Sequence, residues 1–139
     1  MPTLTMFTVC NSIGDLNPQP GVSIPTLNGP QAVLRPLFIP SSFSFGISAG
    51  VIGIDLTKPN SIRFVITNPD KKIIQDSGES GFPALPEGDS LPIEYQGFML
   101  TLDIRNLVIE KEGIYVFELY VNGVSAGTRE IPIFAAKRQ

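Results

Sequence analysis

The stretch EGIYVFELYVNGV, residues 112–124, has the most regular pattern in the chain. Its large apolar side chains recur at every second position: Tyr115, Phe117, Leu119 and Val121. This period of two predicts a β-strand with one buried face. Asn122-Gly123 follows at once, and both residue types accept the positive φ angles of a two-residue type I′ turn. We therefore expect a β-hairpin with Val121 opposite Val124 and Leu119 opposite Ala126.

Two changes of parity predict irregular positions in the neighbouring strands. Ile131 has the opposite parity to Ala126, so we expect a β-bulge between Thr128 and Pro132. The apolar residues of the segment 98–109 also change parity part of the way along, which predicts a long, bent strand with a bulge near Arg105-Asn106.

Further alternation predicts strands at residues 3–10, 43–51 and 62–66. In the first, a shift of parity suggests a bulge, and after the last the turn NPDKK at 68–72 predicts a hairpin into KIIQD. One face of 43–51 carries only serine and glycine. A strongly twisted or bent strand is the preferred interpretation of that face, although small residues would also let a strand, a backbone or a partner approach closely.

The composition agrees with a fold made of short strands. The chain has 139 residues with 42% hydrophobic residues, 13 prolines and 13 glycines. Proline costs about 3 kcal/mol inside a helix, so this composition favours strands joined by turns. We expect a single domain over residues 1–139, with long Pro-rich loops at about 11–30 and 76–97, the first of which could instead be an excursion at the edge of a sheet.

Together these features predict an all-β fold: an immunoglobulin-like (or C2-like) antiparallel β-sandwich of about seven to eight strands. The Gly113-x-Tyr115 pair follows the long bent strand, where such sandwiches place a corner tyrosine whose hydroxyl bonds back to the chain. Phe117 takes the position of the second disulfide cysteine in antibody domains, and Phe64 the position of the core tryptophan. We expect apolar packing alone to hold the sheets together.

Charge and residue usage exclude several classes of function. The formal net charge is −3 and the chain has no histidine, so we expect no nucleic acid partner and none of the common hydrolase mechanisms. The single cysteine, Cys10, excludes an internal disulfide and is interpreted as a buried, inert thiol. No leader or membrane-spanning run is evident, and we expect a cytoplasmic protein that contacts no membrane.

The candidate chemical sites have weak patterns. The acidic segment that carries Asp76, Glu79, Glu87, Asp89 and Glu94 lacks the close carboxylate spacing of a calcium loop. Asp55, Asp70 and Asp76 stand at predicted strand ends and would form a C2-like calcium site only if they converged. Glu110 and Glu112 resemble a carboxylate pair, but they flank a turn. We therefore expect no catalytic residue, no cofactor-binding residue, no metal ligand and no cofactor.

Three segments, FSFGISAGVIGIDL at 43–56, ITNPDKKIIQDSGE at 66–79 and KEGIYVFELYVNG at 111–123, carry a family resemblance. Over residues 30–136 the chain resembles a family of small uncharacterised bacterial β-sandwich proteins from Firmicutes and their mobile elements. The resemblance implies the sandwich fold and transfers no site residue.

The expected function is that of a non-enzymatic interaction module. Proline-stiffened loops on a rigid scaffold lose little entropy on binding, so we expect protein–protein contacts, with a protein partner or by self-association, through the segments 11–30 and 76–97 or through an open sheet edge. Two alternatives stay open: a small-ligand or calcium-binding C2-like domain, and a structural component of a phage or mobile-element particle.

Overall fold

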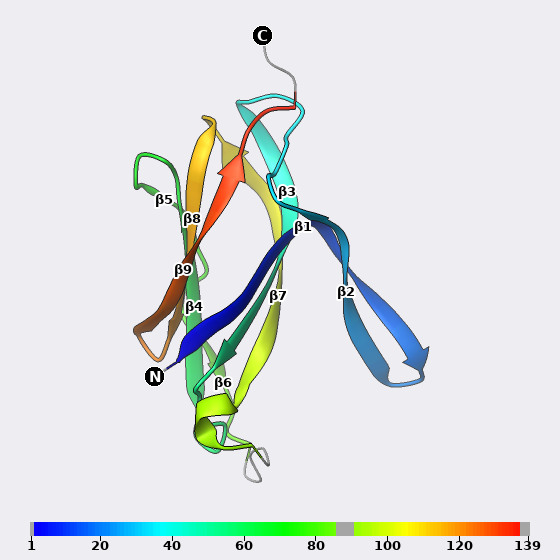
Figure 1. Ribbon diagram of the computed structural model, residues 1–139, viewed down its shortest axis with the longest axis vertical. Coiled ribbons are helices and arrows are strands. Elements are labelled where there is room, and N and C mark those ends of the chain that lie inside the picture. Colours follow the sequence, from blue (N-terminus) through cyan, green and yellow to red (C-terminus); the bar gives the residue numbers. More distant parts are fainter. Residues whose placement is uncertain (1, 86–90, 137–139) are drawn as a thin grey trace.

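The computed structural model describes residues 2–85 and 91–136. Within these ranges the chain forms nine strands and one 3₁₀ helix, and the strands make up two antiparallel sheets (Figure 1). The first sheet has the order β2-β1-β3-β7, with bounds Val22–Gln31, Thr3–Gln19, Ser41–Ile52 and Gly97–Ile109. The second has the order β5-β4-β8-β9, with bounds Ile73–Asp76, Asn60–Thr67, Gly113–Val121 and Val124–Ile133. The short strand β6 (Ser80–Phe82) pairs with β4, and the 3₁₀ helix η1 covers Ile93–Tyr95.

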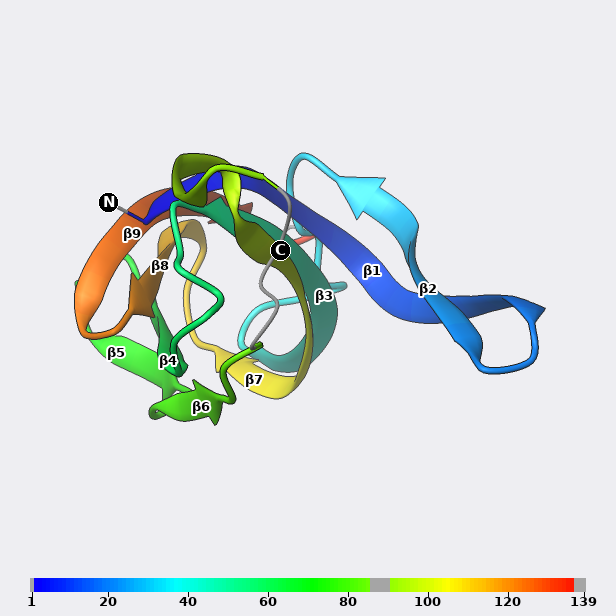
Figure 2. The ribbon, with the colours of Figure 1, turned by 90° about the horizontal axis from the view of Figure 1, so that it is seen from below.

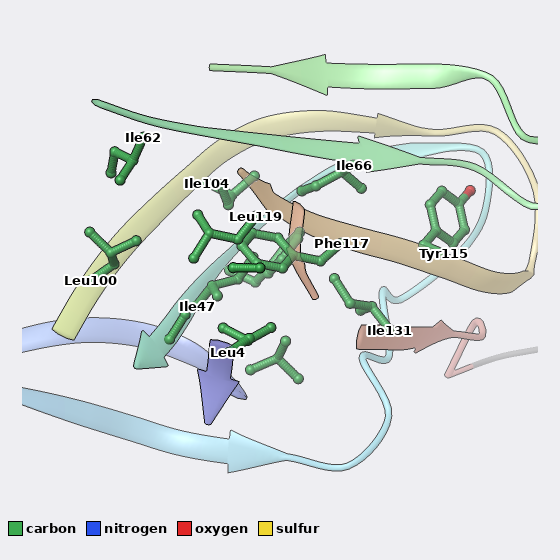
Figure 3. Packing of buried hydrophobic residues seen from close by; sticks show 14 of the residues in the cluster. Leu4, Ile47, Ile62, Ile66, Leu100, Ile104, Tyr115, Phe117, Leu119 and Ile131 are labelled. Atoms are coloured by element: carbon green, nitrogen blue, oxygen red, sulfur yellow. The ribbon is translucent and has the colours of Figure 1, made fainter. Parts of the chain in front are cut away.

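The predicted antiparallel β-sandwich is confirmed. The two inner faces share one apolar core, in which the β8 side chains Tyr115, Phe117, Leu119 and Val121 are all buried (Figure 3). The Phe64 and Phe117 rings stack with centroids 5.8 Å apart. Both lie in the second sheet, at the tryptophan and cysteine positions of antibody domains. Between the sheets, the Phe7 ring of β1 lies 5.0 Å from the Phe117 ring, centroid to centroid, so apolar packing takes the place of the inter-sheet disulfide.

The strand order identifies the type of sandwich. The path β1-β3-β7 in one sheet faces β9-β8-β4 in the other, which is the A-B-E and G-F-C arrangement of an immunoglobulin-like fold. The bent strand before the corner is also confirmed: Asn106 has φ 54°, and the β3–β7 register shifts beside it. Two elements take the number of strands above the predicted seven to eight, namely β2 and β6.

The hairpin of β8 and β9 turns as predicted, but its register is different. Asn122 and Gly123 have φ 51° and 79°, and Val121 pairs with Val124. Leu119, however, pairs with Gly127 and not with Ala126. The predicted bulge between Thr128 and Pro132 is therefore wrong, because the register shifts nearer the turn, between the pairs Tyr120–Ser125 and Leu119–Gly127. Gly127 has φ 146°, a conformation that glycine adopts readily.

The segment 11–30 is not a long loop, which corrects that prediction, and it agrees instead with the alternative of an excursion at the edge of a sheet. β1 runs on to Gln19, and β2 pairs with it in a long hairpin. Pro20-Gly21 forms the turn, with Gly21 at φ 80° as the third residue of a type II turn requires. The prolines within β2 are tolerated because β2 is an edge strand.

The segment 76–97 is also more ordered than predicted. It begins at the end of β5, includes β6 and η1, and reaches the first residue of β7. β6 adds to the edge of β4, where Ser80 pairs with Ile62. The acidic residues Glu87 and Asp89 lie outside the described residues.

Candidate interaction surfaces

The predicted corner at Tyr115 is structural. The Tyr115 side chain is 1% exposed, and its hydroxyl donates a hydrogen bond to the Lys111 carbonyl at 2.7 Å. Burial raises the pKa of Tyr115 above its ordinary value. A buried hydroxyl bonded to its own chain is well placed to brace the β7–β8 connection, and it is not poised to act as a catalytic acid.

The three carboxylates proposed for a C2-like calcium site do not converge. Asp55 lies before β4 and Asp70 lies beyond its other end, and eight strand residues separate these ends by roughly 25 Å. Asp76 forms a bidentate ion pair with Arg63, with oxygen–nitrogen distances of 2.9 and 2.7 Å. The guanidinium lowers the pKa of the Asp76 carboxyl to about 2. The described residues contain no cluster of three potential metal ligands.

The paired glutamates before β8 face different surroundings. Glu110 is exposed and lines an open groove of about 370 Å³ between the edges of β5 and β7, together with Lys72 and Asn68. Glu112 does not line this groove. The two carboxylates therefore do not face each other across a cleft, as the residues of a glycosidase pair must.

The main feature that sequence reasoning missed is a projecting hairpin, residues 11–29, which we call the arm. Figures 1 and 2 show β1 and β2 leaving the sandwich and extending to one side of it. Almost all of its residues are exposed or only half-buried. Asp15 is the only charged residue of the arm, in a chain with ten basic and thirteen acidic residues. The sequence signal that could have revealed the arm is the turn pair Pro20-Gly21, which stands between two short segments that carry the apolar residues Leu16 and Ile24.

The arm displays an apolar pair to solvent. Leu16 on β1 lies directly opposite Ile24 on β2, and the two side chains are 55% and 45% exposed. Opposed side chains of an antiparallel pair share one face of the hairpin. The free edge of β2 carries Pro25 and Pro30, which lack an N–H group and hinder the addition of another strand. The other edge of the arm, β1 beyond Cys10, has no paired strand among the described residues, because β3 pairs with β1 only over Thr3–Cys10. The arm therefore offers its apolar face and this edge of β1 as contact surfaces.

The root of the arm is fixed to the sandwich by close packing. A Cβ atom on Gly46 of β3 would lie 2.8 Å from the Cys10 sulfur and 2.8 Å from Cγ1 of Ile13. The small face of residues 43–51 is thus approached closely by this chain itself, and β3 also has a register shift between Phe43 and Phe45, which is compatible with the predicted bend. Cys10 is fully buried as predicted, and burial raises the pKa of its thiol.

A second exposed apolar surface lies at the end of the sandwich near β6. There a cleft of about 270 Å³ opens between β6 and the beginning of β7. Among the described residues its walls are mainly apolar: Leu56, Phe82, Pro83, Leu85, Phe98, Met99 and Leu100, with Gly97 and the side chain of Asn60. Leu85 and Met99 are each about half exposed. Contiguous exposed apolar side chains of this kind mark ligand or protein contacts.

The edge of β9 is partly covered, in contrast to the arm. Leu34 donates its N–H to the Pro132 carbonyl at 2.9 Å, and Phe134 donates to the Leu34 carbonyl at 3.0 Å. Arg35 donates to two further carbonyls just after β9. The chain between the arm and β3 therefore occupies hydrogen-bonding groups that another strand could use.

Comparisons with known proteins add little to this description. No family model and no curated protein match the sequence. One solved structure to which the chain is similar is an immunoglobulin-like protein from Pseudomonas aeruginosa, with 9% sequence identity, 96% of this chain and 97% of that chain covered, and a TM-score of 0.41. So low a TM-score supports no conclusion by itself, and the immunoglobulin-like assignment rests on the strand order and the tyrosine corner. The resemblance to bacterial proteins of Firmicutes stays a prediction.

Within the described residues, no helix is both long enough and apolar enough to span a membrane.

Proposed function

We propose that this β-sandwich is a non-enzymatic interaction module that binds a protein partner through the arm. The observation that carries the proposal is the Leu16–Ile24 pair, held in solvent on a hairpin that contains a single charge. Charged residues are depleted at the centre of protein interfaces, and apolar anchors provide most of the binding energy there.

The energetics of the hairpin support this role. An isolated two-stranded hairpin is at best marginally stable in water, and the outer half of the arm adds no residue to the buried core. Its root, however, packs closely against Gly46 of β3 through Cys10 and Ile13, which anchors the inner end of the hairpin to the sandwich. A pre-ordered hairpin loses less conformational entropy on binding than a flexible loop does.

Site-specific photo-cross-linking tests the proposal in cells that naturally make the protein. A photoreactive phenylalanine analogue replaces Val22 at the tip of the arm, and in a matched control it replaces Val124, which is similarly exposed beside the β8–β9 turn. We expect a discrete protein adduct from position 22 and none from position 124. No adduct from position 22, or the same adducts from both positions, would contradict the proposal.

A further inference from the structure

The chain contains two Asn-Gly pairs, Asn28-Gly29 at the inner end of the arm and Asn122-Gly123 at the turn between β8 and β9. We propose that Asn28 is a site of spontaneous deamidation in the folded protein, and that the reaction loosens the root of the arm. Asn122, in contrast, is protected by its hydrogen bonds. This inference concerns the covalent chemistry of the chain and does not depend on the proposed function of the arm.

An asparagine before a glycine can react with its own main chain. The Gly29 nitrogen loses its proton and attacks Cγ of Asn28, so that a carbon–nitrogen bond forms, the bond from Cγ to Nδ2 breaks, and ammonia leaves with the released proton. Water then opens the five-membered ring at either carbonyl and yields an aspartate or an isoaspartate, with no change of oxidation state. Glycine favours ring closure because it has no Cβ to hinder the attack. Asn17 and Asn68 cannot react in this way, since the prolines that follow them have no N–H group.

The carboxamide of Asn122 is held at both ends. Its Oδ1 accepts the Ser61 N–H at 2.9 Å, and its Nδ2 donates to Oδ1 of Asn60 at 2.9 Å. Asn60 is itself buried and donates to the carbonyls of Asp55 and Lys58 at 3.0 and 2.9 Å. Both bonds of the Asn122 side chain must break before its Cγ can turn toward the next nitrogen of the main chain.

The carboxamide of Asn28 is held less firmly. Among the described residues its one hydrogen-bond partner is Ser12, whose Oγ accepts from Nδ2 at 3.2 Å, at the long end of the range for such bonds. Asn28 and Gly29 are both exposed, so water can replace this bond. Beyond Cys10 the arm consists of two strands only. A two-stranded hairpin is marginally stable in water, so the main chain can also move into the geometry of attack.

The two sites differ in structure but closely resemble each other in local sequence. An aliphatic residue precedes each asparagine, Leu27 at the first site and Val121 at the second, and both asparagines are exposed. In the unfolded chain the two sites should therefore react at similar rates. In the folded chain the additional hydrogen bond at the second site should slow its reaction roughly fivefold or more, which corresponds to the ordinary strength of one such bond.

The reaction would alter the contact between the arm and the sandwich. Asn28 pairs with Ser12, and the Ser12 carbonyl accepts the hydrogen bond of the Cys10 thiol at 3.2 Å. An isoaspartate inserts the side-chain methylene into the main chain of β2, which disturbs the register of the two strands at this pair. Either product also adds a negative charge to an arm that otherwise carries only Asp15. The buried Cys10 thiol should then become accessible.

Peptide mapping by mass spectrometry tests the site. The purified chain is incubated in mildly alkaline buffer, either folded or unfolded in urea, and the deamidated fraction is measured at both asparagines. In the folded chain we expect deamidation to be roughly fivefold or more faster at Asn28 than at Asn122, and in urea we expect similar rates. Equal rates in the folded chain, a faster reaction at Asn122, or no reaction at Asn28 before unfolding would overturn the inference.

Ellman's reagent tests the effect on the arm. The deamidated protein, which has an additional negative charge, is separated by ion exchange, and its Cys10 should react faster than that of the unmodified protein. Asn28→Gln is the matched control, because glutamine keeps the carboxamide but cannot close a five-membered ring. Its thiol should stay protected after the same incubation. Thiol reactivity that deamidation leaves unchanged, or that rises equally in the control, would show that this reaction does not loosen the root of the arm.

Discussion

Replacing Tyr115 with phenylalanine removes one oxygen atom from the corner between β7 and β8 and leaves the ring in place. The lost hydroxyl is buried and donates a 2.7 Å hydrogen bond to the Lys111 carbonyl. A typical intramolecular hydrogen bond contributes about 1 kcal/mol, and a buried carbonyl left without a donor costs about 1–3 kcal/mol. Lys111 is exposed, so water can replace the donor, and we expect a loss of about 1–1.5 kcal/mol in the free energy of unfolding.

Urea unfolding followed by circular dichroism measures this loss. With a slope of about 1.5 kcal/mol/M the midpoint should fall by roughly 0.7–1 M. Tyr95→Phe is the control, because Tyr95 is an exposed tyrosine of η1, and its free energy of unfolding should change by less than about 0.5 kcal/mol. An unchanged midpoint for Tyr115→Phe, or an equal change in the control, would refute the bracing role of the hydroxyl.

The same pair of proteins gives an independent check at high pH. Burial raises the pKa of Tyr115 in the folded state, so the folded chain holds the phenolic proton more tightly than the unfolded chain does. The stability that this proton contributes is fully present below the ordinary tyrosine pKa of about 10 and is lost as the pH rises through the raised value. The stability difference between wild type and Tyr115→Phe should therefore shrink above about pH 10. A difference that stays constant up to pH 11 would contradict the assignment of this pKa shift.

Three further outcomes are expected from other sites. Gly97→Ala should prevent folding or lower the free energy of unfolding by more than about 3 kcal/mol, because the added Cβ would overlap a β3 carbonyl. The control Gly81→Ala places its Cβ in open space, so its free energy of unfolding should stay within about 0.5 kcal/mol of wild type in the same urea assay. Asp76→Asn should lower the free energy of unfolding slightly at neutral pH and leave it unchanged near pH 2. The reason is that the stability from the ion pair with Arg63 is present above the ordinary carboxyl pKa and is lost as the pH falls through about 2. A loss of stability that persists near pH 2 would contradict this prediction. The thiol of Cys10, buried and with a raised pKa, should react with Ellman's reagent only at the rate of unfolding, and rapid reaction in native buffer would show that the root of the arm opens.

Patterns within single strands predicted the core correctly. Alternation along 113–121 identified the inward face of β8, and Asn122-Gly123 identified its turn. Both depend on contacts between residues close in sequence and on the period of two. The bulge near Asn106 was predicted for the same reason, because a change of parity must be absorbed within the strand.

Position within a sheet could not be predicted in this way. The prolines of 11–30 were interpreted as breakers, yet a proline in an edge strand costs no ladder hydrogen bond if its nitrogen faces outward. Only the order β2-β1-β3-β7 shows that β2 is an edge. The bulge at Gly127 was misplaced for a related reason: a Cβ there would lie 3.1 Å from Cβ of Leu4, so packing against β1 constrains the residue at that position.

The sequence by itself thus determined the all-β class, the inward faces, the turn at Asn122-Gly123 and the corner at Tyr115, because each follows from the local geometry of the chain. The tertiary structure alone decided that 11–29 projects as an arm and that Leu56, Leu85 and Met99 meet in one cleft. These features join residues that are distant in the chain, and no local periodicity or propensity records which strands become neighbours.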